Sequence, residues 1–252
     1  MSTRSPAAPP PDLTDLPAAE QIDGPPGGVL LLCDHASNHV PADVALGVPP
    51  ALLDLHIGYD IGAAALTRGL AAALDAPAVL GTVSRLVIDL HREPHHDGLI
   101  PVRSDGHPIP GNEGIDRDHR IERFHTPYHA AIDQAVRLYR PRLIVAIHSF
   151  TPRLESDGYE RPWQVGILYN QDSRAAHRAI SILRDRGLIT GDNEPYSGRD
   201  LNATLNRHAE AHGIPSMSVE VRNDLIADDA GVAEWTVILS DVIAGLQREC
   251  AQ

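Results

Sequence analysis

A run of five apolar residues, Val29 to Cys33, ends abruptly at Asp34 and His35. The run has no polar face and is too short for a surface helix, so it predicts a strand covered on both sides. In open α/β sheets, ligands bind just beyond the carboxyl ends of the strands. The position of His35 therefore predicts a reactive or ligand-binding histidine at the edge of a buried sheet.

A second apolar run, Leu143 to Ile147, ends in the same way, at His148 and Ser149. Each histidine taken alone fits a hydrogen-bonded loop residue as well as it fits a metal ligand. Two buried strands that each deliver a histidine at their carboxyl end favour the second interpretation. They supply half of a metal site, and a carboxylate or another histidine would have to complete it.

Strand-like and helix-like segments alternate along the rest of the chain, which predicts a three-layer α/β/α sandwich with a mixed, largely parallel sheet. The expected strands are 29–33, 78–82, 86–90, 143–147, 163–169 and 217–221, and the expected helices are 51–74, 119–139, 173–186, 201–212 and 232–246. Residues 91–116 show no periodicity, and an irregular connection of this length is more often functional than idle.

The composition fits one globular domain with a substantial core, since the chain has 252 residues of which 42% are hydrophobic. We expect a Pro/Ala-rich flexible N-terminus over residues 1–26 and a single domain over 27–252. The net charge of -13, without a block of lysine or arginine, argues against a nucleic-acid or membrane partner.

Two cysteines, Cys33 and Cys250, form no disulfide framework, and the sequence shows no apolar stretch long enough to span a membrane. Both features predict a cytoplasmic protein. The sequence leaves the oligomeric state open.

The sequence lacks the motifs of several well-known classes of binding and catalytic site. The chain lacks a Gly-x-x-x-x-Gly-Lys phosphate loop, a Gly-x-Ser-x-Gly nucleophile elbow, a His-Glu-x-x-His helix and a paired Cys-x-x-Cys. With no obvious nucleophile for covalent catalysis, the histidines and carboxylates at strand ends favour hydrolysis assisted by a zinc ion with an open coordination position.

The third metal ligand is open at this stage. Asp54, His56 and Asp60 follow His35 in the next expected helix. Asp54 and His56 cannot share a helical face, so at most one of them joins Asp60 in facing inward. Spacing alone favours Asp54 as a carboxylate placed against the positive end of the helix dipole.

Glu220 lies in the middle of the last expected strand, where a buried carboxylate is costly unless it is paired or used. It could face solvent on an edge strand, form an ion pair with Arg222, or act as a general base. Arg85, Arg92 and Arg222 flank strand cores, and an arginine fork matches a substrate carboxylate, although structural ion pairs are the default for each.

Five stretches together resemble the N-formylglutamate amidohydrolase family, in its shorter branch. They follow the order of the family and are fairly specific in combination. They are Asp34 to Asn38 with Pro41, Asp54 to Ala63, Ser84 to Arg92, Ile147 to Phe150, and Val219 to Leu225. The chain departs from the family pattern at His91, where the family usually has asparagine.

This resemblance implies a fold similar to that of zinc carboxypeptidases and one zinc ion per chain, bound by His35, His148 and a carboxylate. It favours Asp54 over Asp60 and His56 as that third ligand, and it makes Glu220 the general base. The substrate-binding residues that it implies are Arg85, Arg92, Arg222, His56 and Asn112, the last of which could equally be a turn residue.

The resulting hypothesis is a zinc-dependent amidohydrolase that cleaves the amide of an N-formyl amino acid, with N-formyl-L-glutamate as the first candidate. Its only expected partner is this small-molecule acyl amino acid. The alternatives are a zinc carboxypeptidase, an N-acyl amino-acid deacylase, or a non-catalytic protein that binds a metal or an amino acid on the same fold.

Overall fold

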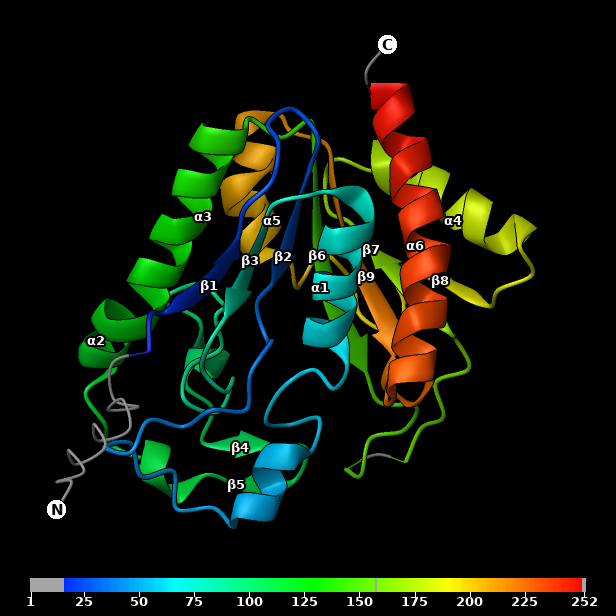
Figure 1. Cartoon of the computed structure of the whole chain (residues 1–252). Helices are drawn as coiled ribbons and strands as arrows, with labels where there is room; N and C mark the ends of the chain where they lie inside the picture. The colour runs from blue at the N-terminus through cyan, green and yellow to red at the C-terminus, as the bar shows by residue number, and fades with distance from the viewer. Residues whose placement is uncertain (1–15, 157, 251–252) are drawn as a thin grey trace, which may run out of the picture.

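Figure 1 shows the computed structural model of the chain, which describes residues 16–156 and 158–250. Within these residues, a mixed sheet has the strand order β1-β3-β2-β6-β9-β7-β8. Its strands are β1 (Ala19–Ile22), β2 (Val29–Cys33), β3 (Ala78–Gly81), β6 (Leu143–Phe150), β7 (Val165–Leu168), β8 (Thr190–Asp192) and β9 (Ser216–Arg222). The four central strands β3, β2, β6 and β9 are parallel, whereas β1 and β7 run antiparallel to their neighbours β3 and β9.

Helices cover both faces of this sheet, which confirms the predicted three-layer sandwich (Figure 1). One face carries α1 (Ala63–Leu74), α4 (Arg174–Asp185) and α6 (Asp229–Cys250). The other face carries α3 (Thr126–Tyr139) and α5 (Ala203–His208), with the short α2 (Arg117–Arg120) and a π-helical turn at Ile121–His125 leading into α3.

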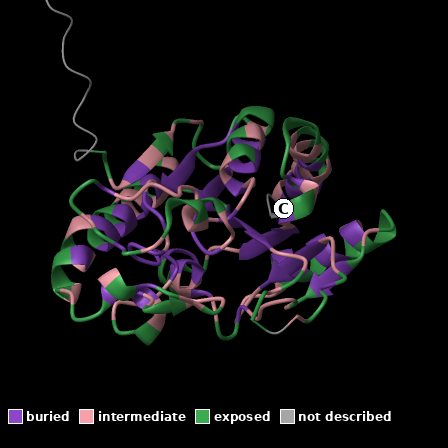
Figure 2. Cartoon of the chain, turned by 90° about the horizontal axis from the view of Figure 1, so that it is seen from below, coloured by how far each residue is buried: buried purple, intermediate pink, exposed green. Residues whose placement is uncertain are grey.

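Strand β2 is apolar throughout because its alternate residues enter two separate cores. Leu31 and Cys33 of β2 pack into the core beneath α1 and α6, while Leu30 and Leu32 pack into the core beneath α3. Figure 2 shows the sheet as a buried layer between partly exposed helices. A strand that is covered on both faces needs no polar side, so the run Val29–Cys33 contains none.

The order of the strands also places the functional end of the sheet. From β2 the chain moves to β3 on one side, and it later crosses to β6 on the other side. In such sheets the connections diverge at this point and leave a crevice at the carboxyl ends of the two strands. The ends of β2 and β6, which carry His35 and His148, lie at this crevice.

The expected helix 51–74 is two separate elements. A 3-10 helix, Pro50–Asp54, is followed by an irregular turn, and α1 begins only at Ala63. Gly62 has φ = 80°, and a Cβ atom there would collide with the backbone oxygen of Ile226. This turn lets Asp60 point into the sheet edge independently of Asp54.

The expected strand 86–90 is also wrong, since this segment is an irregular run of turns. Its apolar side chains are buried, but its carbonyl groups have side-chain partners in place of a neighbouring strand. Asn112 Nδ2 donates to Leu86 O at 2.8 Å, and Arg120 donates to Val87 O at 2.7 Å. Buried carbonyls need such partners, so these two side chains replace a strand ladder.

The predicted boundary at residue 26 requires a correction as well. Residues 19–22 form β1 and pair antiparallel with Ala78–Gly81, so part of the segment expected to be flexible belongs to the folded domain. Residues 1–15 of that segment lie outside the described residues. Strand β8 was not expected either; it is only three residues long and lies at the other edge of the sheet.

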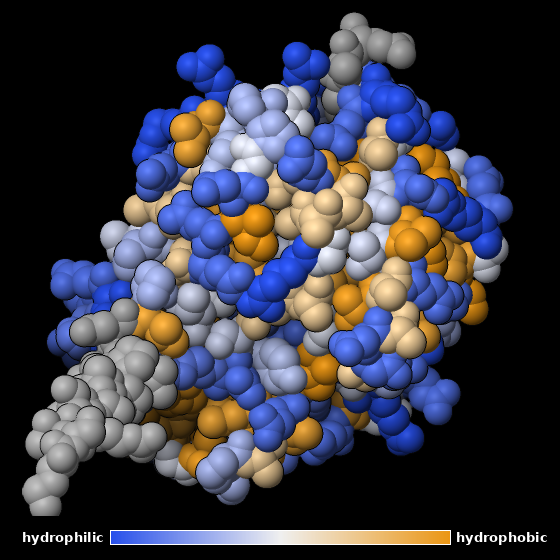
Figure 3. Space-filling model, in the orientation of Figure 1, coloured by the Kyte–Doolittle hydropathy of each residue, from blue (hydrophilic) through white to orange (hydrophobic). Residues whose placement is uncertain are grey.

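The irregular segment 91–116 contains 3-10 turns and the small hairpin of β4 (Arg103–Ser104) and β5 (His107–Pro108). On the face of the molecule seen in Figure 3, apolar side chains are interspersed with hydrophilic ones. None of the helices in the described ranges is both long and apolar enough to cross a membrane.

Candidate active site

Three parallel neighbours bring the candidate chemistry together. His35 is the second residue after β2, His148 lies near the end of β6, and Glu220 lies opposite His148 in the pairing of β6 with β9. Their side chains share a cavity of about 140 Å³. Its lining residues are His35, His56, Asp60, Arg85, His91, Arg92, His148, Ser149, Phe150, Thr151, Leu168, Tyr196, Leu201, Ser218 and Glu220.

Asp60 completes a tight group with the two predicted histidines. Its Oδ2 atom lies 2.9 Å from His148 Nδ1 and 3.3 Å from His35 Nδ1. All three side chains are buried, and one nitrogen or oxygen of each lies within 4.8 Å of the others. The backbone N–H of Asp60 also donates to the carbonyl of His35 at 3.0 Å, which ties the turn before α1 to the end of β2.

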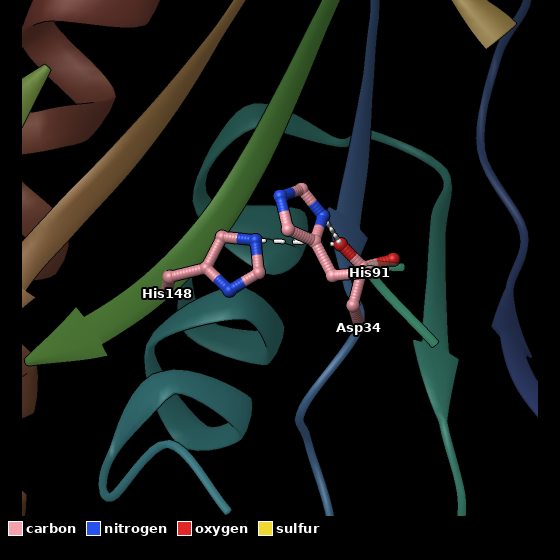
Figure 4. Close-up of side chains that lie close together, drawn as sticks. All are labelled: Asp34, His91 and His148. Carbon is pink, nitrogen blue, oxygen red and sulfur yellow. Dashed lines mark hydrogen bonds and ion pairs between the residues drawn. The ribbon is translucent and has the colours of Figure 1, made fainter. Parts of the chain in front are cut away.

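The second nitrogen of each histidine faces a further buried carboxylate. His35 Nε2 lies 2.7 Å from Asp89 Oδ1, and His148 Nε2 lies 3.3 Å from Asp34 Oδ2. Figure 4 shows His148 and His91 turned toward the carboxylate of Asp34. Histidine ligands of metal ions commonly have such a partner on their other nitrogen, because it fixes the orientation of the ring.

A second group of possible metal ligands consists of Asp34, His91 and His148. In this group the oxygens of Asp34 already accept from Tyr128 Oη at 2.8 Å and Thr204 Oγ1 at 3.1 Å. Asp34 is fully buried and does not line the cavity, whereas all members of the His35, Asp60 and His148 group do. A catalytic metal needs an open position toward the substrate, which favours the group containing Asp60.

Buried carboxylates in and around the site outnumber the guanidinium groups beside them. Asp34, Asp60, Asp89 and Glu220 are buried carboxylates. Two guanidinium groups lie beside them: Arg85 donates to Asp60 and Asp89 at 3.1 and 2.9 Å, and Arg92 Nε lies 3.7 Å from Asp89. The remaining two negative charges can be balanced by protons on His35 and His148 or by one divalent cation in their place.

The histidine pKa values respond to this surplus of negative charge. Burial opposes a charge on either ring, yet the carboxylates around them raise the pKa of His35 and raise the pKa of His148 well above its ordinary value. Burial alone would raise the pKa of Asp60 too, but the charge on His35 and the hydrogen bond from His148 hold it far below its ordinary value. The cluster therefore holds protons where a metal ion could bind.

Glu220 differs from the other carboxylates. Its Oε2 atom is buried and has no hydrogen-bond partner among the described residues. Burial raises the pKa of Glu220 to about 7, and the positive charge of His148 opposes only part of this shift. A carboxylate with a free oxygen and a pKa near neutrality is suited to take up and release a proton.

The donor set His35 Nδ1, Asp60 Oδ2 and His148 Nδ1 fits zinc, which binds histidine nitrogen and carboxylate oxygen and keeps a fourth position open in catalytic sites. The prediction of Asp54 as the third ligand does not match this geometry. Asp54 is exposed, and its carboxylate accepts a hydrogen bond from Asn38 Nδ2 at 2.9 Å. The turn that ends at Gly62 places Asp60 in the cluster instead.

The predicted substrate-binding residues divide into two groups. Arg85, Arg92 and His56 line the cavity. Arg222 does not line it, because its side chain pairs with Asp224 at 2.7 Å. Asn112 is a buried structural residue: its amide donates to Leu86 O and Pro101 O, and its oxygen accepts from Arg120.

Sequence reasoning missed Asp34 and Asp89 as partners of the histidines, and it missed Tyr196 in the cavity wall. For Asp89 a signal was present. Its carboxylate lies between the apolar residues Ile88 and Leu90, and, like that of Glu220, it is costly to bury unless it is paired or used. Nothing in the local sequence around Tyr196 distinguishes it from an ordinary loop residue.

Comparisons with known proteins identify the family of the chain. The profile of the N-formylglutamate amidohydrolase family matches residues 27–227. The chain is similar to the solved structure of a gene product from Agrobacterium tumefaciens, with 31% identity, a TM-score of 0.87 and coverage of 93% of this chain and 96% of that one. It shares its fold with an N-formylglutamate amidohydrolase from Ralstonia eutropha, with 18% identity, a TM-score of 0.73 and coverage of 94% and 99%. No functionally curated protein matches the sequence. The match over most of the chain shows that it belongs to the N-formylglutamate amidohydrolase family.

Proposed function

We propose that the protein is a zinc-dependent amidohydrolase that cleaves the amide of an N-formyl amino acid, with N-formyl-L-glutamate as the first candidate. The products are formate and the free amino acid. One observation carries the proposal. The unpartnered carboxylate of Glu220 shares a small buried cavity with the zinc-compatible group His35, Asp60 and His148.

In this proposal His35, Asp60 and His148 hold the zinc ion. When bound, zinc supplies a Lewis acid that polarises the formyl oxygen and lowers the pKa of water. Asp89 and Arg85 keep these ligands in place. Asp89 lies against His35 at 2.7 Å, and Arg85 donates to the oxygen of Asp60 that faces away from the histidines.

Glu220 is the general base and then the general acid. Its free carboxylate oxygen takes a proton from the attacking water as the new C–O bond forms. The protonated carboxyl then passes that proton to the leaving nitrogen as the C–N bond breaks. Its pKa of about 7 suits both directions of transfer.

Arg92 and His56 are placed to bind the substrate carboxylates. The nearest acid to Arg92 is Asp89 at 3.7 Å, which leaves guanidinium donors available toward the cavity. His56 holds its place through Asp105, at 2.9 Å. An arginine fork recognises a carboxylate through two parallel hydrogen bonds, which suits an acidic amino acid.

An N-acyl amino-acid deacylase is the second candidate, and one observation favours it. A further cavity of about 340 Å³ shares His56, Arg85, Arg92 and Tyr196 with the inner one. It offers room for a substrate larger than a formylated amino acid.

The free, buried thiol of Cys33 supports a reducing compartment, and we propose a cytoplasmic location for either enzyme.

A panel of N-formyl, N-acetyl and dipeptide substrates tests the proposal, with release of formate, acetate or amino acid as the measurement. We expect the highest kcat/KM for N-formyl-L-glutamate and loss of activity with a chelator, restored by zinc. Faster turnover of N-acetyl substrates would favour the deacylase. Bound zinc without turnover of any member of the panel would indicate a binding protein and refute the proposal.

A further inference from the structure

A second group of histidines lies behind the active site and does not line either cavity described above. His129 of α3 and His208 of α5 are fully or nearly fully buried, and the ring nitrogens His129 Nδ1 and His208 Nε2 are 2.7 Å apart. His208 Nδ1 lies 2.8 Å from Asp133 Oδ1, and Asp133 is about one-third exposed. The three side chains form a continuous chain from the surface to the interior.

The inner end of this chain binds the backbone beside the active site. His129 Nε2 lies 3.0 Å from the carbonyl oxygen of Leu90, and His125 Nε2 lies 3.0 Å from the carbonyl oxygen of Arg92. Residues four apart on a helix share one face, so both rings point at the same segment. Together they hold the backbone on both sides of His91, which lines the cavity, as does Arg92 itself.

The same helix also controls the side chain of His91. Tyr128 Oη donates to Asp34 Oδ1 at 2.8 Å, and Asp34 Oδ2 lies 2.9 Å from His91 Nδ1. Helix α3 and the π-helical turn before it therefore contact the backbone around His91 through His129 and His125, and α3 reaches the ring of His91 through Tyr128 and Asp34. Asp89 is tied to the same segment, because it accepts from the backbone N–H of His91 at 3.0 Å.

Hydrogen-bond roles along the chain follow from its two ends. The carbonyl of Leu90 can only accept, so His129 Nε2 carries a proton. Burial lowers the pKa of His129 to about 2, so the ring is neutral and its Nδ1 accepts from His208 Nε2. His208 Nδ1 and Asp133 Oδ1 then face each other at 2.8 Å, which requires a proton between them.

We propose that His129 is a positioning residue for the hydrolysis reaction and that His208 and Asp133 act through it. The chain Asp133, His208, His129 fixes the Leu90 carbonyl and thereby sets where His91 and Arg92 lie in the cavity. An apolar residue at position 129 would avoid the cost of burying an imidazole but would leave the carbonyl of Leu90 without this partner. The inference rests on the proposed function only for its effect on turnover.

The first test replaces the donor while keeping a ring of similar shape. In His129→Phe we expect kcat/KM for the best acyl amino acid to fall about tenfold, mainly through KM, because misplacing such outer partners typically costs that much. His177→Phe is the matched control, since His177 is exposed and its ring pairs with Tyr169, which lines neither cavity of the active site. Equal activity of the two variants would overturn the proposal.

The second test measures the protonation of the histidines in this hydrogen-bonded chain without any substrate, and it uses a conservative surface variant. In Asp133→Asn the amide can donate to His208 Nδ1, so the chain is complete without the shared proton. We expect ¹⁵N NMR to show protons on His129 Nε2 and His208 Nε2 and a bare His129 Nδ1 in both the wild type and Asp133→Asn, with kcat/KM within twofold.

The ring resonances of His91 decide whether the chain acts on the cavity. We expect them to move in His129→Phe and to stay in place in Asp133→Asn and His177→Phe. A bare His129 Nε2 in the wild type, or unmoved His91 resonances in a folded His129→Phe, would refute the positioning role. This result stands even if the enzyme hydrolyses none of the proposed substrates, which separates the two proposals.

Discussion

The two ends of the central sheet present two very different cavities. At the carboxyl ends of the strands, about 140 Å³ encloses His35, Asp60, His148 and Glu220. At the opposite end, where β6 and β9 begin, a cavity of about 660 Å³ is lined by residues such as Arg142, Arg178 and Glu249. The smaller cavity is the candidate active site, so volume alone does not identify it.

The state of the charged groups explains the difference. Arg178 and Glu249 in the large cavity are about half exposed and pair with each other at 2.9 Å. Water and salt screen such a pair, so it needs no further counter-charge. Around the small cavity, the four buried carboxylates of Asp34, Asp60, Asp89 and Glu220 outnumber the two guanidinium groups of Arg85 and Arg92, although Asp34 and Asp89 lie behind the cavity wall. Buried charge without full compensation requires a counter-ion, and this requirement marks a functional site.

The largest expected effect is the loss of the general base. Glu220→Gln should lower kcat by about a thousandfold, because general acid–base catalysis contributes on the order of 10²–10⁴-fold. Zinc content should stay at about one per chain. Glu249→Gln at the other end of the sheet is the matched control and should keep full activity. Near-normal turnover in Glu220→Gln would show that Glu220 is not the general base and that the two cavities do not differ in this catalytic role.

Zinc affinity should distinguish Asp60 from Asp54. Asp60→Asn should weaken zinc binding by more than about a hundredfold, since even groups outside the ligand shell are worth 10–100-fold. Asp54→Asn should bind zinc normally, because its carboxylate is exposed and contacts Asn38. Competition with a chromophoric chelator measures both. The opposite ranking would restore Asp54 as the ligand.

Zinc binding should release protons. In the metal-free protein the raised pKa values of His35 and His148, and the value of about 7 for Glu220, keep protons on the cluster at neutral pH. Zinc displaces them, so its affinity should fall by about tenfold per pH unit of acidification for each proton released. Calorimetry in buffers of different ionisation enthalpy counts these protons, and a binding enthalpy independent of the buffer would contradict the expectation.

The arginines should separate by their position relative to the cavity. Arg92→Ala should raise KM for an acidic substrate by about tenfold or more, because a charged hydrogen bond is worth roughly 1.5–3 kcal/mol. Arg222→Ala should leave KM unchanged, since Arg222 pairs with Asp224 outside the cavity. Steady-state kinetics on both variants is the measurement. A larger effect for Arg222 would show that the substrate extends beyond the cavity described above.

The smallest effect is expected at the far end of the sheet. Arg178→Ala removes a half-exposed ion pair and should change the free energy of unfolding by less than about 1 kcal/mol, with no change in kcat/KM. Urea unfolding and the substrate assay check both quantities. A marked loss of activity would give the larger cavity a role in catalysis.

Local sequence predicted the parts of the site that depend on local pattern. His35 and His148 follow apolar runs and Glu220 interrupts one, so the sequence showed a buried strand with a polar group at its end or within it in each case. The parallel arrangement of these strands followed from the alternation of strands and helices, which also predicted the three layers.

Other features required the folded chain. Residues 86–90 have the composition of a strand, yet their carbonyls bind Asn112 and Arg120, which come from later segments. Strand β1 exists because Ala19–Ile22 pairs with residues about 60 positions away. Such partners are distant in sequence, so no local pattern reveals them.

The choice of the third metal ligand shows most clearly what the sequence predicts and what only the tertiary structure adds. The sequence by itself predicted that a carboxylate or another histidine should join His35 and His148, with Asp54, His56 and Asp60 as candidates, and the family resemblance favoured Asp54. Only the tertiary structure brings Asp60 to the two rings, because a left-handed turn at Gly62 packs against Ile226 and aims Asp60 at them. Side-chain direction after such a turn depends on packing against remote residues, and helical spacing carries no information about it.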